Sequence, residues 1–116
     1  QQVGVSMSEP RLEAGEPGLF RLSGELTFDT VPELLKEGAR LLAGAAELRI
    51  DLSGVRRADS AGLALLAEWL REAGQRRLTL RYLNVPAQLH NLARVSGLDQ
   101  VLPFESAWPE AEEPTT

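Results

Sequence analysis

Apolar and polar side chains alternate in four short stretches, and alternation of this kind predicts β-strands. The first two stretches flank Gly15-Glu16-Pro17-Gly18, whose composition is typical of a turn, so they should form a hairpin. The second of them could continue through residues 24–28, and Ser53-Gly54 should end the third. The predicted strands cover residues 11–14, 19–23, 48–52 and 77–83.

Three longer stretches instead place apolar side chains three and four residues apart, which predicts helices that bury one face. Each is followed by a glycine, the residue found most often just past a helix end. The predicted helices run from about residue 31 to Gly44, from Ser60 to Ala73, and from Pro86 to Val95.

Because helices separate the later strands, those strands should be parallel, with right-handed crossovers. The predicted class is therefore α/β, with a mixed β-sheet covered by helices in the order β-β-α-β-α-β-α. Residues 101–104 are a possible short final element.

The length of 116 residues suits one domain. We expect that domain to span residues 9–105, preceded by a tail of residues 1–8. Residues 1–6 come before the only methionine, Met7, and are expected to be a remnant of cloning. Residues 106–116 are rich in Pro and Glu and are expected to form an acidic tail.

Charge and composition exclude several function classes. The last twelve residues hold four acidic and no basic side chains, and the other 104 residues have a net charge of only −1. Nothing in that balance favours nucleic-acid binding, which needs a basic face. The chain has no cysteine and a single histidine, so disulfides, thiolate-bound zinc and histidine-rich metal sites are not expected. No apolar run is long enough to span a bilayer.

The motifs of common enzyme sites are missing from the sequence. It has neither of the two usual glycine-rich phosphate loops, no zinc-protease motif and no nucleophile elbow. His90 should lie in the third helix on the side facing solvent, with no partner group to make it a catalytic base. We therefore expect a protein that is not an enzyme and that needs no cofactor or metal.

The segment of residues 51–63 combines a strand end, a short loop and a helix start. Asp59 or Ser60 should cap this helix, because nearly every helix needs such a residue. A second interpretation uses the same physics, since a phosphate on Ser60 would be stabilised by the helix dipole and its free amides. Arg56 and Arg57 should lie in the loop before it and could pair with a phosphate or with acidic groups of a partner.

The second helix carries apolar side chains on two sides. Leu63, Leu66, Ala67 and Leu70 should face the core, while Leu65 and Trp69 fall on nearly the opposite side. One interpretation is a docking surface anchored by Trp69, so that Trp69→Ala weakens partner binding while the domain stays folded. The other is that Trp69 packs over a neighbouring helix of the same domain.

The element order and two motifs resemble the STAS domain family, over residues 9–105. The motifs are Asp51-Leu52-Ser53-Gly54-Val55 and Asp59-Ser60-Ala61-Gly62-Leu63. In the branch of anti-sigma-factor antagonists, a partner kinase phosphorylates the serine that Ser60 matches. That branch usually has a second serine where this chain has Ala61.

A second branch, the small STAS subunit (MlaB) of the Mla phospholipid transporter, is more similar. The resemblance rests on residues 59–66 and on the C-terminal region of residues 84–103. It implies a cytoplasmic protein bound to the ATPase of an inner-membrane ABC transporter, and through that ATPase to its permease. It further implies a role in moving phospholipids between the inner and outer membranes, which maintains outer-membrane lipid asymmetry.

The two lines of reasoning together predict a partner-binding site at the start of the second helix. Arg57, Asp59, Ser60 and Ala61 would form its polar part, and Leu65 with Trp69 its apolar part. Ser60 is also the possible phosphate acceptor, in which case the partner would be an anti-sigma-factor serine kinase. No nucleic acid and no direct insertion into the membrane are expected.

Overall fold

The computed structural model describes residues 10–43 and 46–105. Five strands form one sheet in the order β1-β2-β3-β4-β5. The antiparallel pair of β1 and β2 is the expected hairpin, and the other neighbours are parallel, so the predicted mixed sheet is confirmed. The strands are β1 (Arg11–Ala14), β2 (Leu19–Leu26), β3 (Glu47–Ala58), β4 (Thr79–Leu83) and β5 (Phe104–Glu105).

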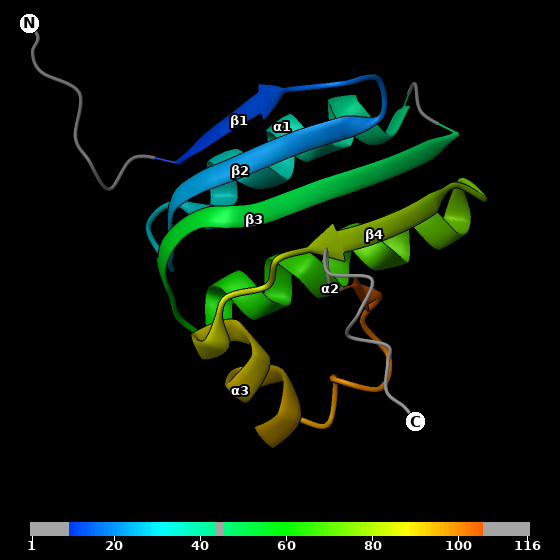
Figure 1. The fold of residues 1–116 in the computed structure, drawn as a ribbon. Coiled ribbons are helices and arrows are strands. Elements are labelled where there is room, and N and C mark those ends of the chain that lie inside the picture. The colour runs from blue at the N-terminus through cyan, green and yellow to red at the C-terminus, as the bar shows by residue number, and fades with distance from the viewer. Residues whose placement is uncertain (1–9, 44–45, 106–116) are drawn as a thin grey trace, which may run out of the picture.

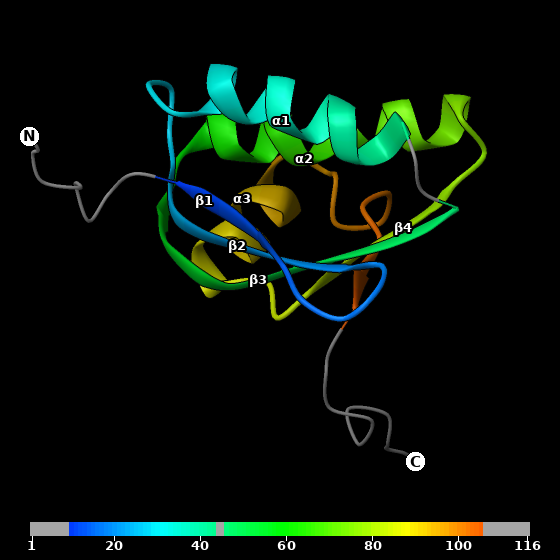
Figure 2. The same cartoon turned by 90° about the horizontal axis from the view of Figure 1, so that it is seen from above.

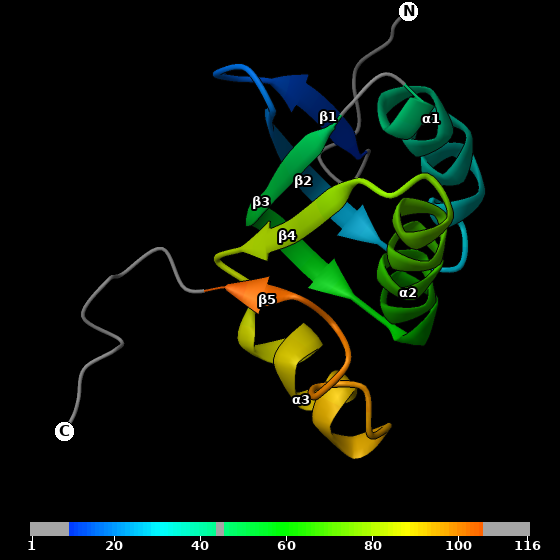
Figure 3. The same cartoon turned by 90° about the vertical axis from the view of Figure 1, so that its right-hand side faces the viewer.

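The helices are α1 (Val31–Ala43), α2 (Ser60–Gln75) and α3 (Ala87–Val95). Helices α1 and α2 lie side by side over one face of the sheet (Figures 1 and 2). Seen along the sheet in Figure 3, both are on one side of the strands, and α3 lies beyond the β4–β5 end. The expected helix stop at Gly44 falls outside the described residues.

Strand β3 is longer than predicted, because it continues through Ser53-Gly54 to Ala58. Its pairing with β2 shifts register twice, which breaks the alternation that would mark a strand in the sequence. Gly54 allows the two strands to approach, since a Cβ there would lie 2.6 Å from the Cβ of Ser23. The loop expected before α2 is therefore strand, and Arg56 and Arg57 are exposed strand residues.

Helix α2 packs on the sheet with one side and against α1 with another, so it buries two faces. On the sheet side, the hydroxyl of the fully buried Tyr82 donates a 2.7 Å hydrogen bond to the Leu66 carbonyl oxygen. Burial raises the pKa of the Tyr82 hydroxyl well above its usual value. On the α1 side, Trp69 lies against Gly38, where a Cβ would come within 2.1 Å of the indole Nε1. The glycine in α1 thus makes room for the tryptophan of α2.

Candidate functional site at the start of α2

Asp59 joins the end of β3 to the first turn of α2. Its main chain is extended, and its Oδ1 accepts a 2.8 Å hydrogen bond from the N–H of Ala61. Its own N–H donates to the carbonyl oxygen of Leu26 at 3.1 Å, which ties the junction to the end of β2. Of the two residues expected to cap this helix, Asp59 is therefore the one that does so.

Ser60 is the first residue of α2, and it is exposed. Because Asp59 supplies the cap, the Ser60 hydroxyl is not needed for it. A group added to that hydroxyl would lie in the positive field of the helix N-terminus, where a phosphate or a partner carboxylate is stabilised. Chemically, the position suits recognition or modification.

Ala61 is half-buried beside the core, and Gly62 follows it. A Cβ on Gly62 would lie 2.8 Å from both the Cβ and the carbonyl oxygen of Leu26. Only glycine lets the first turn of α2 approach the end of β2 this closely. Residues 59–62 thus have three separate physical roles: Asp59 caps the helix, Gly62 allows close packing and Ser60 stays exposed.

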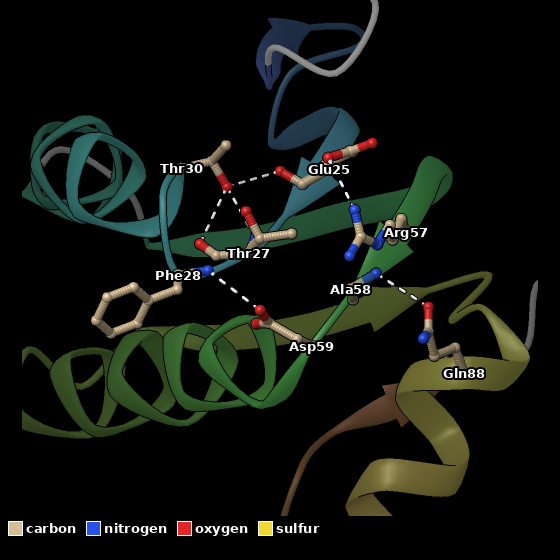
Figure 4. Close-up of polar contacts among 8 residues, drawn as sticks. All are labelled: Glu25, Thr27, Phe28, Thr30, Arg57, Ala58, Asp59 and Gln88. Carbon is tan, nitrogen blue, oxygen red and sulfur yellow. Dashed lines mark hydrogen bonds and ion pairs between the residues drawn. The ribbon is translucent and has the colours of Figure 1, made fainter.

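The β2–α1 loop lies beside this junction (Figure 4). The hydroxyl oxygen of Thr30 accepts from the N–H of Thr27 at 2.9 Å and donates to the carbonyl oxygen of Glu25 at 2.8 Å. Asp59 reaches the same loop with its second oxygen, since Oδ2 accepts from the N–H of Phe28 at 3.3 Å. One carboxylate therefore holds the start of α2 and the β2–α1 loop together.

Two further contacts hold the end of β3. Gln88 of α3 accepts a 3.0 Å hydrogen bond at Oε1 from the N–H of Ala58. Arg57 lies across from Glu25, its partner on β2, with 3.8 Å between Nη1 and Oε1. The Arg57 side chain is 66% exposed, so this ion pair contributes little stability and leaves the guanidinium accessible.

Leu65 and Trp69, predicted as the apolar part of the site, are not displayed on the surface. Leu65 is 1% exposed and Trp69 is 2% exposed, because α1 covers this side of α2. In the described part of the chain, the Nε1 of Trp69 has no hydrogen-bond acceptor, so the indole is a packing group. The alternative, that Trp69 packs over a neighbouring helix, is the one that holds.

An open groove of about 460 Å³ does run between α1 and α2. Leu65 and Trp69 contribute to its lining, and Glu68 and Glu72 are also among its lining residues. Leu35 is its most exposed large apolar residue, at 38%. The exposed apolar lining of the groove therefore comes from Leu35 and Ala39 of α1 and from Ala64 of α2.

Asp51 lies on β3, on the face of the sheet opposite α1 and α2, and is half-buried. Burial alone would raise its pKa, but hydrogen bonds from Asn84 and Ser53, with the charge of Arg21 nearby, hold the pKa of Asp51 below its ordinary value. Its Oδ1 accepts from the N–H of Ser53 at 2.9 Å and from Nδ2 of Asn84 at 3.0 Å. The carboxylate ties β3 to the turn that leads into α3.

His90 is exposed on α3, as predicted, and its ring meets Phe104 edge-on with 5.2 Å between centroids. Across residues 10–43 and 46–105, no group of three His, Cys, Asp or Glu side chains is placed to hold a metal ion. No helix in these ranges is both long and apolar enough to cross a membrane.

Sequence reasoning placed Arg57, Asp59, Ser60 and Ala61 at one junction, and the structure does bring them together. It missed Glu25, Phe28 and Gln88, which reach the junction from β2, the β2–α1 loop and α3. Phe28 alone left a signal, as a large apolar residue in the otherwise polar run Thr27-Phe28-Asp29-Thr30.

A family model described as "Mlab, STAS domain" matches residues 12–103. The chain belongs to the STAS domain family. No curated protein sequence matches it.

Several solved STAS structures share its fold. An anti-sigma factor antagonist from Mycobacterium paratuberculosis has 24% identity and a TM-score of 0.70, covering 88% of this chain and 87% of that one. The phosphorylated form of the Bacillus cell fate determinant SpoIIAA has 18% identity and a TM-score of 0.65, covering 88% and 94%. The murine anion transporter Solute Carrier 26 family member A9 has 17% identity and a TM-score of 0.64, covering 81% of this chain and 17% of that one. At these identities the likeness establishes the fold, which is the STAS fold expected from the motifs.

Proposed function

We propose that this chain is a non-catalytic STAS subunit that binds and supports the ATPase of an Mla-type ABC transporter. That transporter would move phospholipids between the inner and outer membranes and maintain outer-membrane lipid asymmetry. The observation that carries the proposal is the match of the Mlab family model to residues 12–103. The chain would be cytoplasmic and would reach the inner membrane only through the ATPase and its permease.

The geometry of the junction supports a binding role. Ser60 and Arg57 are both exposed and lie three residues apart, and Asp59, Gln88 and Thr30 hold the backbone around them through hydrogen bonds. A surface that is already ordered loses little conformational entropy when a partner binds. The groove with Leu35 between α1 and α2 includes Ala64, one helical turn after Ser60, and would supply the apolar contact first assigned to Leu65 and Trp69.

The chain would act by thermodynamic linkage, in which its binding favours the assembled form of the ATPase. A subunit that binds only the folded, assembled ATPase stabilises that form by mass action, and needs no chemistry of its own. In this proposal Ser60 is a contact residue, and Arg57 pairs with an acidic group of the ATPase.

The test is an equilibrium titration of the purified Mla-type ATPase of the same organism with this chain. Ser60→Arg should weaken binding at least about tenfold, because a long charged side chain would occupy the contact surface. Ser96→Arg is the matched control, because Ser96 is also an exposed serine but caps the C-terminal end of α3. Equal binding by both variants would remove Ser60 from the interface, and no binding by the unmodified chain would refute the function.

A second candidate has its own support. The solved relatives include anti-sigma factor antagonists, one of them in a phosphorylated form, and Ser60 is exposed at the helix N-terminus. In this alternative an anti-sigma-factor serine kinase phosphorylates Ser60 and so blocks its own binding. Incubation with that kinase and ATP should add one phosphate, and Ser60→Ala should abolish the addition. A Ser60→Asp chain that binds the kinase normally would count against this function.

A further inference from the structure

We propose that Phe28 is an aromatic anchor that enters an apolar pocket on the protein partner, beside the contact made by Ser60. This inference rests on the proposed function and names a contact of the same surface. It assigns the apolar contact to a residue of the β2–α1 loop, whereas the sequence pattern assigned that contact to Leu65 and Trp69 of α2.

Phe28 is 80% exposed. The other Phe, Tyr and Trp rings in the described ranges are buried or half-buried, Trp69 and Tyr82 almost completely. Leaving a phenyl ring in water forgoes the stabilisation that burial of so large an apolar side chain would bring. A ring displayed this way suits a surface whose final burial comes from a partner.

The ring is displayed from a backbone that hydrogen bonds hold at Thr27 and at Phe28 itself. The Thr30 hydroxyl oxygen accepts a hydrogen bond from the N–H of Thr27, the residue before Phe28. The Asp59 carboxylate accepts one from the N–H of Phe28 itself. Thr27 is buried, so the loop cannot swing freely about this point. In Figure 4 the ring points away from Glu25 and Arg57, out of the hydrogen-bonded cluster. An anchor held in place before binding costs less to immobilise in the complex.

The position links Phe28 to the proposed contact surface. The carboxylate that accepts from the Phe28 N–H is the one that caps α2 at Ala61, and Ser60 is the residue between Asp59 and Ala61. Val95 and Val101 are also well exposed, but they lie in and after α3. Among the exposed large apolar residues described, Phe28 is the one joined to the junction by a hydrogen bond to Asp59.

Charge indicates what kind of pocket fits. Asp29, next to Phe28, and Glu33, in the first turn of α1, are both exposed acids. The matching surface is an apolar pocket with lysine or arginine at its rim. The same acids disfavour insertion of Phe28 into an anionic membrane surface, which repels carboxylates.

The experiment uses the purified Mla-type ATPase and four forms of the full chain. Phe28→Ala should weaken binding about tenfold or more, as expected for an aromatic residue at the centre of an interface. Phe28→Leu should lose less, because it keeps part of the apolar contact. Val95→Ala is the matched control, being 83% exposed but outside the junction, and should bind as the unmodified chain does. All forms should unfold at nearly the same temperature, because the Phe28 ring and the Val95 methyl groups that the substitutions remove are exposed.

The outcomes separate the two proposals. If the unmodified chain binds the ATPase and Phe28→Ala binds equally well, the anchor is refuted while the proposed function stands. If the unmodified chain does not bind the ATPase, both the proposed function and the Phe28 contact with this partner are refuted. If instead Phe28→Ala reduces sedimentation with phosphatidylglycerol vesicles and leaves ATPase affinity unchanged, Phe28 contacts lipid and the protein-anchor proposal is overturned.

Discussion

The first turn of α2 and the body of the same helix are built on different principles. In the body, Leu65 and Trp69 are almost completely buried against α1, and a glycine in α1 makes space for the indole. In the first turn, Asp59 caps the helix through a hydrogen bond and Ser60 is exposed to solvent. The helix body is thus held by side-chain packing, and the first turn by hydrogen bonds.

The difference shows where binding residues can be changed without loss of the fold. Side chains that fill a packed interior serve stability, and their removal leaves a cavity. At the junction the main chain is held by hydrogen bonds, so the exposed side chains of Ser60, Arg57 and Phe28 are available to a partner. The structure therefore assigns stability to the helix body and makes the first turn the candidate for recognition.

The largest effect should come from the helix body. Trp69→Ala should lower the free energy of unfolding by about 3–5 kcal/mol, because it leaves a large cavity between α1 and α2. Urea denaturation followed by circular dichroism measures this loss, with Val95→Ala as a control that should change stability by less than about 0.5 kcal/mol. A loss below about 1 kcal/mol together with weaker partner binding would instead favour the exposed-anchor interpretation of Trp69.

The capping carboxylate should have a smaller effect. Asp59→Ala removes two accepted hydrogen bonds, from Ala61 and from Phe28, and should cost about 0.5–2 kcal/mol. Asp59→Asn keeps an amide oxygen that can accept from Ala61, so it should lose less. The same urea titration tests both, and a Ser60→Ala chain should stay close to the unmodified one. If Ser60→Ala destabilised the chain as much as Asp59→Ala, Ser60 would be structural.

The smallest expected effect is a loss of folding stability at low pH, caused by protonation of Asp51. The folded-state pKa of Asp51 lies below its ordinary value of about 3.9, so its ionised form favours the folded state. Its contribution is complete above that value and is lost as the pH falls through the lower folded-state pKa. We expect a loss of about 1 kcal/mol, because the group is only half-buried. Thermal unfolding between pH 5 and about pH 2 measures it, and Asp51→Asn should flatten that dependence. Parallel curves for both chains would show that Asp51 makes no such contribution.

Much of the fold was predictable because its signals are local. The hairpin follows from the turn sequence 15–18, and a helix cap at Asp59 or Ser60 follows from the chemistry of their side chains, with the structure deciding for Asp59. Strand β3 was predicted too short, because its register shifts against β2 interrupt the alternation after residue 52. A bulge depends on the neighbouring strand, and periodicity within one segment does not report it.

The candidate site divides in the same way. Arg57, Asp59, Ser60 and Ala61 were placed together because they are neighbours in the chain. Leu65 and Trp69 were misplaced because a helical projection shows which residues share a face, and does not show what covers that face. Phe28 and Gln88 lie about 30 positions from their partners at the junction, so only the folded chain could reveal their contacts.

By itself, the sequence determined the element order, the α/β class, a cap at Asp59 or Ser60 and the resemblance to STAS domains, since each depends on residues close together in the chain. Tertiary structure decided that α1 covers Trp69, that β3 extends to Ala58, and that one carboxylate joins Phe28 to the start of α2. Those outcomes depend on how separate segments pack, and packing is decided by the shape and volume of surfaces that the chain brings together only when it folds.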